Sequence, residues 1–517
     1  MAQNISGTSL LANSQAASAT PCFRVRFDWS DLGFGSIASW TDESARIKSM
    51  SGESRLVDMD RSPSPLGASV SSVAHVVLDN EETTGFRFSP TNPNGPLYAY
   101  IQNGLHLKRC RIELGYKASG VPEYAPVLTG YLTGGDENYT GRTVDFEIRD
   151  RSSAAALTRA STELYADVGA QTYIALSLGL IDRDPPGPSE RVIDAGIVLH
   201  PFAWLDDERV WDELKDLAQG HGGRVWFDNA GVFRFESLGH LVRPQANSWK
   251  DPTVSQYTFT VNRFQDCEPQ TDPASVINHV VIEASPLYRS VLQTVYKASE
   301  VYAVPPGGSL TVKARHRWPA DSVLDPVAGV DYVALTAGAV DITANVSIVR
   351  TSKATSSELA IANNNANYTA FLYTLQLRGA PILTAQPVRV EIEDAASIAA
   401  YGRRTETFKN PYIQGRRHAE ALAGFVLARC KVPPLTLALR GAPAAPWLEC
   451  GDRVTVQEAL TGVNADFFIT AIRWDYDGGM TQNLDLIKAS ALYPYSDYFQ
   501  IGTSAWGTGT GKGRLMW

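Results

Sequence analysis

Residues 127–132 read VLTGYL and residues 143–148 read TVDFEI, with a polar turn between them. Apolar and polar side chains alternate along both runs, which is the period of a strand that buries one face. The same plan returns near the other end of the chain, where FFITAI at 467–472 precedes a polar turn and NLDLI at 483–487. Each pair of runs predicts an antiparallel hairpin. Their likeness reflects either a duplicated β-domain or chance, because alternating hairpins are common.

Similar runs surround the first hairpin and extend its β-character towards the N-terminus. They are FRVRF at 23–27, the run 73–78 and RIEL at 111–114, with turn-rich stretches at 89–95 and 134–138 between strands. The pattern predicts an antiparallel β-barrel or sandwich over residues 21–151. Residues 1–20 are rich in Ser, Ala, Asn and Gln, which is typical of a flexible arm.

The segment 152–255 changes character and predicts a small α+β domain. Helical runs occur near 153–157 and 173–180, and Trp211, Leu214 and Leu217 recur at helical spacing before Gly220, which we expect to adopt a left-handed cap. The runs 225–227 and 232–235 then predict a hairpin. A helix is therefore expected to pack on a two-stranded ribbon.

Strands return in the rest of the chain. We expect a β-rich domain over 256–395, holding part of a second barrel and an insertion, and completion of that barrel with one helix over 396–490. The expected strands are 278–284, 310–314, 342–350, 371–377 and 388–392, and the expected helix begins near 414. Residues 491–517 form a Gly-rich C-terminal arm whose end, Leu515 to Trp517, we expect to dock on a partner. The predicted fold class is mainly β with α+β modules.

Composition restricts the class of protein. With 44% hydrophobic and 20% charged residues over 517 positions, the chain can bury several large cores. Its net charge of -9 argues against a protein that grips nucleic acid, which needs clustered Lys and Arg. No apolar stretch approaches the 18 residues of a membrane span, and no secretion signal is recognisable, so we expect assembly in a cytoplasm. The five cysteines lack CxxC spacing and are expected to be reduced: Cys22, Cys110, Cys267, Cys430 and Cys450.

Catalytic motifs are missing from the sequence. There is no GxSxG or HExxH, and GTGTGK at 507–512 departs from the phosphate-loop pattern. The run GFGSIA at 33–38 favours a loop between strands, and DYDGG at 475–479 favours a hairpin turn. The acidic run 206–208 is expected to cap the helix that follows it. We therefore expect no enzyme activity, no cofactor, and no catalytic, cofactor-binding or metal residues.

Three groups of segments resemble, in their order, the baseplate hub or tail-tip hub proteins of tailed bacteriophages. The first group is WTD at 40–42, the run 69–80, PTN at 90–92 and VLTG at 127–130. The second is VWDELKDLA at 210–218 with GGRVWFD at 222–228 and GVFRF at 231–235. The third is YGR at 401–403, NPYI at 410–413, the helix around 419–426 and GDRV at 451–454.

This resemblance implies a homotrimer in which each chain supplies two tail-tube-like β-barrels to a pseudo-sixfold ring. It implies a virion protein at the tail tip, through whose lumen DNA passes during genome ejection without specific binding. The implied partners are the tail tube or a distal tail protein, the tape-measure protein and receptor-binding or fibre proteins. The resemblance brings no catalytic residue, and no lysozyme or peptidase module is recognisable.

Two other readings stay open from the sequence. The 11 Trp and 21 Tyr could provide sugar-stacking platforms in a receptor- or carbohydrate-binding tail protein. A β-rich glycoside hydrolase is a further alternative, because the separation of its two acids is set in three dimensions and leaves no sequence spacing.

Overall fold

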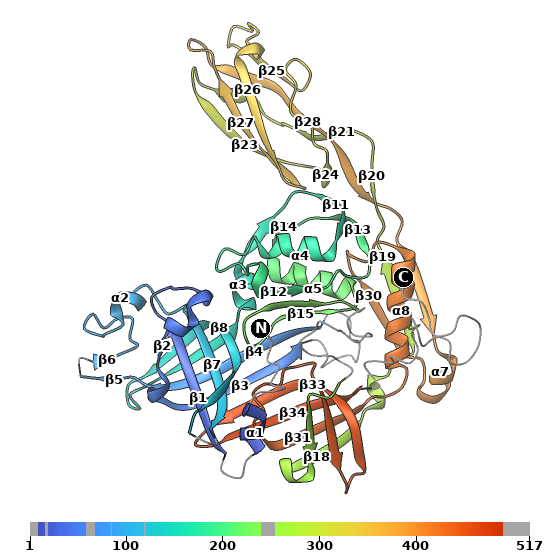
Figure 1. Cartoon of the computed structure of the whole chain (residues 1–517). Helices are drawn as coiled ribbons and strands as arrows, with labels where there is room; N and C mark the ends of the chain where they lie inside the picture. The colour runs from blue at the N-terminus through green and yellow to red at the C-terminus, as the bar shows by residue number, and fades with distance from the viewer. Residues whose placement is uncertain are drawn as a thin grey trace.

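The computed structural model describes residues 9–15, 19–57, 68–83, 85–117, 120–238 and 254–489. The protein is mainly β, as the sequence predicts (Figure 1). Its dominant element is one large sheet that contains strands from both ends of the chain.

The first half of this sheet has the spatial order β3-β4-β9-β8-β7-β1, in which all neighbours are antiparallel. The bounds are β1 Thr20–Asp28, β3 Ile47–Val57, β4 Ala68–Asp79, β7 Arg109–Lys117, β8 Glu123–Asn138 and β9 Thr143–Asp150. Short β2 (Thr41–Asp42) pairs with β1. The strands expected at 23–27, 73–78, 111–114 and 143–148 are thereby confirmed.

The second half has the order β18-β31-β34-β33-β32-β17. The bounds are β17 Tyr257–Thr260, β18 Asp266–Thr271, β31 Leu435–Pro443, β32 Arg453–Glu458, β33 Val463–Tyr476 and β34 Met480–Lys488. The two orders correspond strand for strand. Only the last pair differs, because β17 runs parallel to β32 whereas β1 runs antiparallel to β7.

The correspondence extends to single residues at the two hairpins that the sequence singles out. In β8 the pairing with β9 shifts between Leu132 and Gly134, and in β33 the pairing with β34 shifts between Ile469 and Ala471. The residue at each shift is a threonine whose Oγ1 donates to the backbone oxygen of an acidic residue. Thr133 reaches Glu147 at 3.4 Å and Thr470 reaches Asp485 at 2.9 Å. Matching bulges favour duplication over chance, because a bulge is a specific local feature of a strand pair.

The two halves are joined edge to edge. The outer half of β33 extends past β32 and pairs with β3, from Ala471 opposite Arg55 to Tyr476 opposite Met50. One apolar core lies beneath both halves and includes Phe27, Phe146, Phe467 and Trp474. Alternation along each strand places these side chains on the buried face and polar side chains on the other.

A small α+β domain lies beside the sheet. It contains α3 (Ser152–Leu157), α4 (Ala170–Leu178), α5 (Val210–Gly220) and the ribbon of β15 (Arg224–Phe227) with β16 (Phe233–Glu236). Trp211 of α5 stacks on Phe227 of the ribbon at 5.9 Å, which confirms the predicted helix-and-ribbon packing. The remaining strands form short pairs: β12 (Arg191–Ile193) with β16, β10 (Arg159–Ser161) with β14 (Asp206–Arg209), and β11 (Tyr165–Gly169) with β13 (Leu199–Ala203).

The cap expected at Gly220 is wrong. His221 follows the helix with φ of -94°, and it is Gly222 that adopts a positive φ of 60°. Gly220 has a different reason to lack a side chain, because a Cβ there would lie 2.6 Å from Cβ of Tyr412. The glycine permits close approach of another segment rather than a left-handed turn.

Between β18 and β31 the chain forms two further modules. The nearer one is a sheet of β29 (Val388–Glu393), β19 (His279–Ala284) and β30 (Thr405–Lys409), packed against α8 (Arg416–Cys430), with α7 (Ala395–Tyr401) beside it. The farther one is a β-sandwich that projects from the body (Figure 1). Its long strand β28 (Ala370–Thr384) pairs with β20 (Leu287–Arg289), β21 (Gln293–Lys297), β22 (Tyr302–Val304), β24 (Ala320–Asp321) and β25 (Tyr332–Leu335). The facing sheet is β23 (Ser309–Arg315), β27 (Ser356–Asn363) and β26 (Val346–Ser352).

Minor elements complete the described chain. They are α1 (Ser9–Gln15), α2 (Tyr98–Ile101), the pair β5 (Glu81–Glu82) and β6 (Gly85–Phe86), and the 3-10 turns Phe34–Ser39, Ser44–Arg46, Pro188–Glu190, Val261–Arg263, Pro273–Ser275 and Thr343–Asn345. All five cysteines are free thiols, of which Cys110, Cys430 and Cys450 are buried. Across the described ranges, no helix has the length and apolar character needed to cross a membrane.

Candidate functional site

The polar face of the large sheet is the broadest candidate for a functional surface. Strand pairing aligns its side chains in rows across both halves, so that Glu268 of β18 lies in register with Ala438, and Ala438 with Asp485. In the first half, Val73, His75 and Val77 of β4 lie opposite Arg149, Glu147 and Asp145 of β9. Carboxylates outnumber guanidiniums along these rows.

Arginines of this face are held by neighbouring carboxylates. Arg473 contacts Glu53 at 3.1 Å across the joint between the halves and Asp485 at 3.2 Å. Arg440 contacts the same Asp485 at 2.7 Å, and Arg149 contacts Glu147 at 2.6 Å. A phosphate backbone binds to clustered cations that are not already paired with carboxylates. A face that pairs these cations with acids therefore offers a phosphate backbone little unpaired positive charge.

A groove of about 610 Å³ opens on this face near the end of the second half-sheet. Its polar lining includes Arg55, Glu268, Gln270, Arg440 and Asp485. Acidic and basic groups both line the groove, so it has no single-sign charge that would select an anion.

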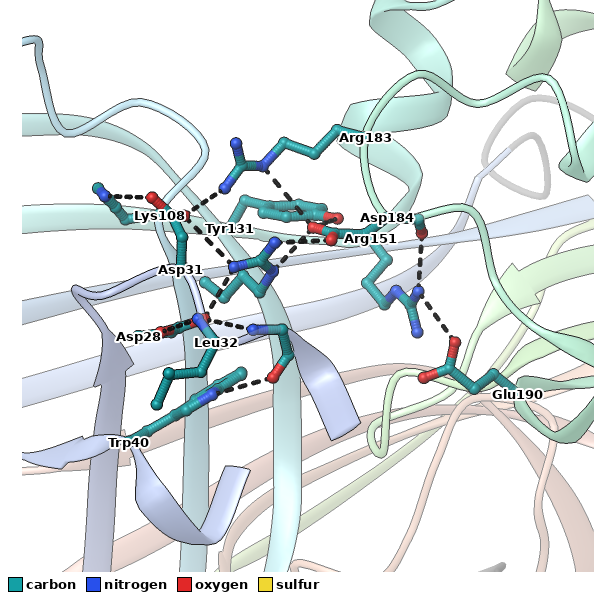
Figure 2. Close-up of polar contacts among 12 residues, drawn as sticks. Asp28, Asp31, Leu32, Trp40, Lys108, Tyr131, Arg151, Arg183, Asp184 and Glu190 are labelled. Carbon is teal, nitrogen blue, oxygen red and sulfur yellow. Dashed lines mark hydrogen bonds and ion pairs between the residues drawn. The ribbon is translucent and has the colours of Figure 1, made fainter. Parts of the chain in front are cut away.

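A buried ionic cluster joins the first half-sheet to the α+β domain (Figure 2). Arg109 of β7 donates at 2.8 Å to Asp28 of β1, and its Nη2 donates at 2.6 Å to Asp184. The hydroxyl of Tyr131 donates to the same Asp184 at 2.9 Å. Burial by itself would raise the pKa of Asp184, but the hydrogen bonds and charge of Arg109 hold that pKa below its usual value.

The segment 33–38 supplies the aromatic part of this cluster. As predicted, it lies between two strands, here β1 and β2, and forms a 3-10 turn. The guanidinium of Arg151 lies 4.2 Å from the centre of the Phe34 ring, and Tyr131 meets the ring edge-on at 5.5 Å. Arg151 also donates to the backbone oxygens of Gly231 at 2.8 Å and Asp184 at 3.0 Å. The sequence gives no sign of this role, because its members lie far apart in the chain.

A second junction, between the α+β domain and the α8 module, consists of buried polar side chains. Asn410 donates to the backbone oxygen of Asp216 at 2.8 Å, and Gln414 donates to that of Phe202 at 2.9 Å. His418, on the first turn of α8, contacts the Gly220 oxygen at 2.6 Å. We call the contact of residues 410–418 with α5 and β13 the histidine seam.

Two further histidines lie inside the histidine seam. Nε2 of His200 and Nε2 of His221 are 2.8 Å apart, and both side chains are fully buried. His221 Nδ1 accepts from the Ile197 amide at 3.1 Å, so its Nε2 carries the proton and donates to His200. Burial lowers the pKa of His200 and His418 to about 4, and that of His221 well below its usual value.

A buried carboxyl completes the histidine seam. Glu213 of α5 accepts hydrogen bonds from the hydroxyls of Tyr173, at 2.7 Å, and Tyr412. Burial raises its pKa to about 8, so the carboxyl is largely protonated at neutral pH. The hydrogen bonds from the two tyrosine hydroxyls connect Glu213 of α5 to α4 and to the segment that precedes α8.

The other sequence expectations have mixed outcomes. The acidic run 206–208 forms β14, and the N-cap of α5 is Arg209 without a side-chain cap hydrogen bond, so the expected capping role is wrong. DYDGG at 475–479 is the predicted hairpin turn, with Tyr476 opposite Met480. GTGTGK at 507–512 and Leu515 to Trp517 lie outside the described residues. Among the residues that are described, no group of three or more His, Cys, Asp or Glu could hold a metal ion.

Comparison with known proteins gives structural likenesses only. No family model matches the chain, and no curated protein does. The tail protein from Neisseria meningitidis MC58 is 10% identical, with a TM-score of 0.48 over 92% of this chain and 98% of that one. The 43 kDa tail protein of prophage MuSo2 from Shewanella oneidensis is 9% identical, with a TM-score of 0.45 over 91% and 99%. The prophage tail protein gp18 from Listeria monocytogenes EGD-e is 10% identical, with a TM-score of 0.40 over 90% and 94%.

Proposed function

We propose that the chain is a structural hub protein of a phage tail tip, which assembles into a ring that continues the tail tube. The observation that carries this proposal is the joint between the two half-sheets. Within one chain, β3 of the first half pairs with the outer half of β33 in the second. A chain built from two repeats that join in this way carries the two complementary edges of that joint, one at each of its ends.

The strand correspondence identifies these edges. The counterpart of β3 is β18, whose described partner is β31 alone. The counterpart of the outer half of β33 is the run 134–138 of β8, where β9 is the described partner. A second copy can therefore place its β18 against this run, repeating the joint already present within the chain. Contacts between two different surfaces close into a ring when the rotation between copies allows.

Three copies supply six half-sheets, which is the number that a sixfold tube presents. The ring is then a homotrimer, with two tail-tube-like barrels per chain, assembled in the host cytoplasm and incorporated into the virion. The polar face of the sheet lines its lumen, where paired arginines and excess carboxylates let DNA slide past during ejection. The partners in this proposal are the tube or a distal tail protein, the tape-measure protein and fibre proteins. The protein acts without catalysis.

The mass of the full chain in solution, by light scattering, tests the ring. We expect a particle of about three times 56.2 kDa with a central hole in negative-stain images. A variant with Pro in place of Thr271 removes a backbone donor from the β18 edge, where Pro269 already lacks one, and is expected to remain monomeric. A control variant with the same change at Ser49, inside β3, is expected to unfold the sheet instead. A wild-type chain that stays monomeric at every concentration and salt level contradicts the proposal.

A further inference from the structure

The free end of the β-sandwich gathers three loops. They are residues 305–308 between β22 and β23, 336–345 between β25 and β26, and 364–369 between β27 and β28. Antiparallel strands bring these connections to the same end. The opposite end is fixed to the α+β domain, where Ala354 donates to the Thr162 oxygen at 2.8 Å and Thr355 donates to Asp206. The sandwich therefore projects with its loops away from the large sheet (Figure 1).

The composition of these loops differs from that of the chain. They read PPGG, TAGAVDITAN and NNANYT, in which Asp341 is the one charged residue, whereas 20% of the whole chain is charged. The Asp341 carboxylate accepts from the Thr343 amide at 2.8 Å. Apart from this one exposed carboxylate, the three loops offer a ligand only uncharged groups: amides, hydroxyls, backbone groups and one aromatic ring.

Hydrogen bonds of two asparagine side chains hold the loops in place. Asn363, only 1% exposed, donates to the backbone oxygens of Val304, Pro305 and Tyr368 at 3.1, 3.1 and 2.8 Å. Asn365 accepts from the amides of Asn367 and Tyr368 at 2.9 and 3.1 Å. The Asn364 amide donates to the Asn345 oxygen at 2.8 Å, which ties the third loop to the second. A fixed conformation reduces the entropy that binding would otherwise cost.

Tyr368 is exposed at the centre of this arrangement. Its side chain is 57% exposed, although its backbone is held on both sides, and the side chains of Asn364 and Asn367 are exposed beside it. A tyrosine ring offers an apolar face with a polar edge, and amides donate and accept at once. Rigid Tyr with adaptable Asn is also the combination that loops at the end of antibody sandwiches use to bind their ligands.

We propose that this loop end binds a neutral glycan on a cell surface. The C–H face of a sugar ring stacks on Tyr368, while the Asn364 and Asn367 amides bond neighbouring hydroxyls. The three loops contain no cation and one exposed carboxylate, that of Asp341, which disfavours acidic polysaccharides and phosphate-rich surfaces. This site does not depend on the proposed trimeric ring, because it lies on a module inserted between two strands of the large sheet.

The test uses the full chain and immobilised polysaccharides in biolayer interferometry. The panel contains dextran, mannan and galactan as neutral probes and alginate as an acidic one. We expect binding to at least one neutral probe, weakened at least tenfold by Tyr368→Ala and by Asn365→Ala. Tyr288→Ala is the matched control, because Tyr288 is 47% exposed on β20 near the fixed end of the sandwich, and it should bind within twofold of the wild type.

Three results would overturn the proposal. They are binding to none of the neutral probes, binding to alginate alone, and equal loss in Tyr368→Ala and Tyr288→Ala. Binding to a protein ligand, with no response to any polysaccharide, would assign the loops to a protein partner instead. Equal melting temperatures of the three variants and the wild type show that a loss of binding is not a loss of folding.

Discussion

Arg109 donates to both carboxylate oxygens of Asp184, at 2.8 Å from Nε and 2.6 Å from Nη2, although the two residues belong to different domains. The same guanidinium reaches Asp28, whose side chain is fully buried. This arginine therefore neutralises carboxylates that have little access to water, and it fixes the α+β domain to the first half-sheet.

Replacing Arg109 with Leu should lower the free energy of unfolding of this region by about 3–5 kcal/mol, because it leaves Asp28 buried without a counter-charge. Urea unfolding followed by tryptophan fluorescence measures the change. Arg149→Leu is the control: its pair with Glu147 is exposed, so a cost below about 1 kcal/mol is expected. A similar loss of unfolding free energy in the two variants would show that the buried cluster stabilises the protein no more than an exposed ion pair does.

Gly52 marks the joint between the half-sheets. A Cβ at this position would lie 2.3 Å from the Trp474 ring, so Gly52→Ala should displace the tryptophan and cost about 1–3 kcal/mol. Thermal unfolding measures the loss. Gly35→Ala is the control, because no atom lies within 4 Å of its Cβ, and it should leave the melting temperature nearly unchanged. An unaltered Gly52→Ala protein would mean that the joint adapts easily.

The histidine seam should weaken in acid. His200 and His418 have pKa values of about 4 when folded, below the value near 6.5 of an exposed imidazole. The lowered pKa of each imidazole means that its contribution is complete above pH of about 6.5 and is lost as the pH falls towards 4. Glu213 acts in the opposite sense: its pKa of about 8 gives a contribution present at low pH and lost as the pH rises towards 8.

The destabilising effect of protonating three imidazoles should exceed the stabilising effect of protonating one carboxyl. The urea concentration at the midpoint of unfolding should therefore decrease as the pH is lowered from 6.5 to 4.5. His418→Gln keeps a donor for the Gly220 oxygen and should reduce the slope of that fall. His75→Gln should leave the slope unchanged, since His75 is about half exposed on the sheet. A midpoint that rises on acidification would show that Glu213 dominates the histidine seam.

Ring formation should depend on salt in an unusual direction. In the proposed joint between copies, the run 134–138 contributes Asp136 and Glu137, while β18 contributes Asp266 and Glu268. Added salt screens this repulsion, so we expect the trimeric fraction in sedimentation to increase between 50 and 500 mM NaCl, values chosen to span about 14 to 4 Å of Debye length. Asp136→Asn with Glu137→Gln should form trimers at lower salt. A trimer that dissociates as salt increases would place other surfaces at the contact.

Local periodicity in the sequence was enough to predict much of the secondary structure. Alternation at 127–132 and 143–148 predicted one hairpin, and the same pattern at 467–472 and 483–487 predicted the other. Successive side chains of a strand point to opposite faces of the sheet, so the pattern has a period of two residues whichever strand lies alongside. Helical spacing around Trp211 predicted α5 for an equivalent reason. Glycine was less informative. From the sequence, Gly220 could not be distinguished from a glycine that caps a helix, because the side chain that leaves no room for a Cβ there belongs to Tyr412, far along the chain.

Contacts between distant residues could be found only in the tertiary structure. The sequence does not show that β18 and β31 are neighbours, because two folded modules separate residue 271 from residue 435. Nor does it show that Arg109, Phe34 and Asp184 meet, or that His221 donates a hydrogen bond to His200 in the histidine seam. The sequence by itself determined where most strands and helices form, since that depends on side chains a few residues apart. The strand expected at 342–350 is a partial exception, because it begins only at Val346, after the 3-10 turn Thr343–Asn345. Which edges pair, and which charges are buried together, was decided by packing between segments whose separation in the chain leaves no periodic trace.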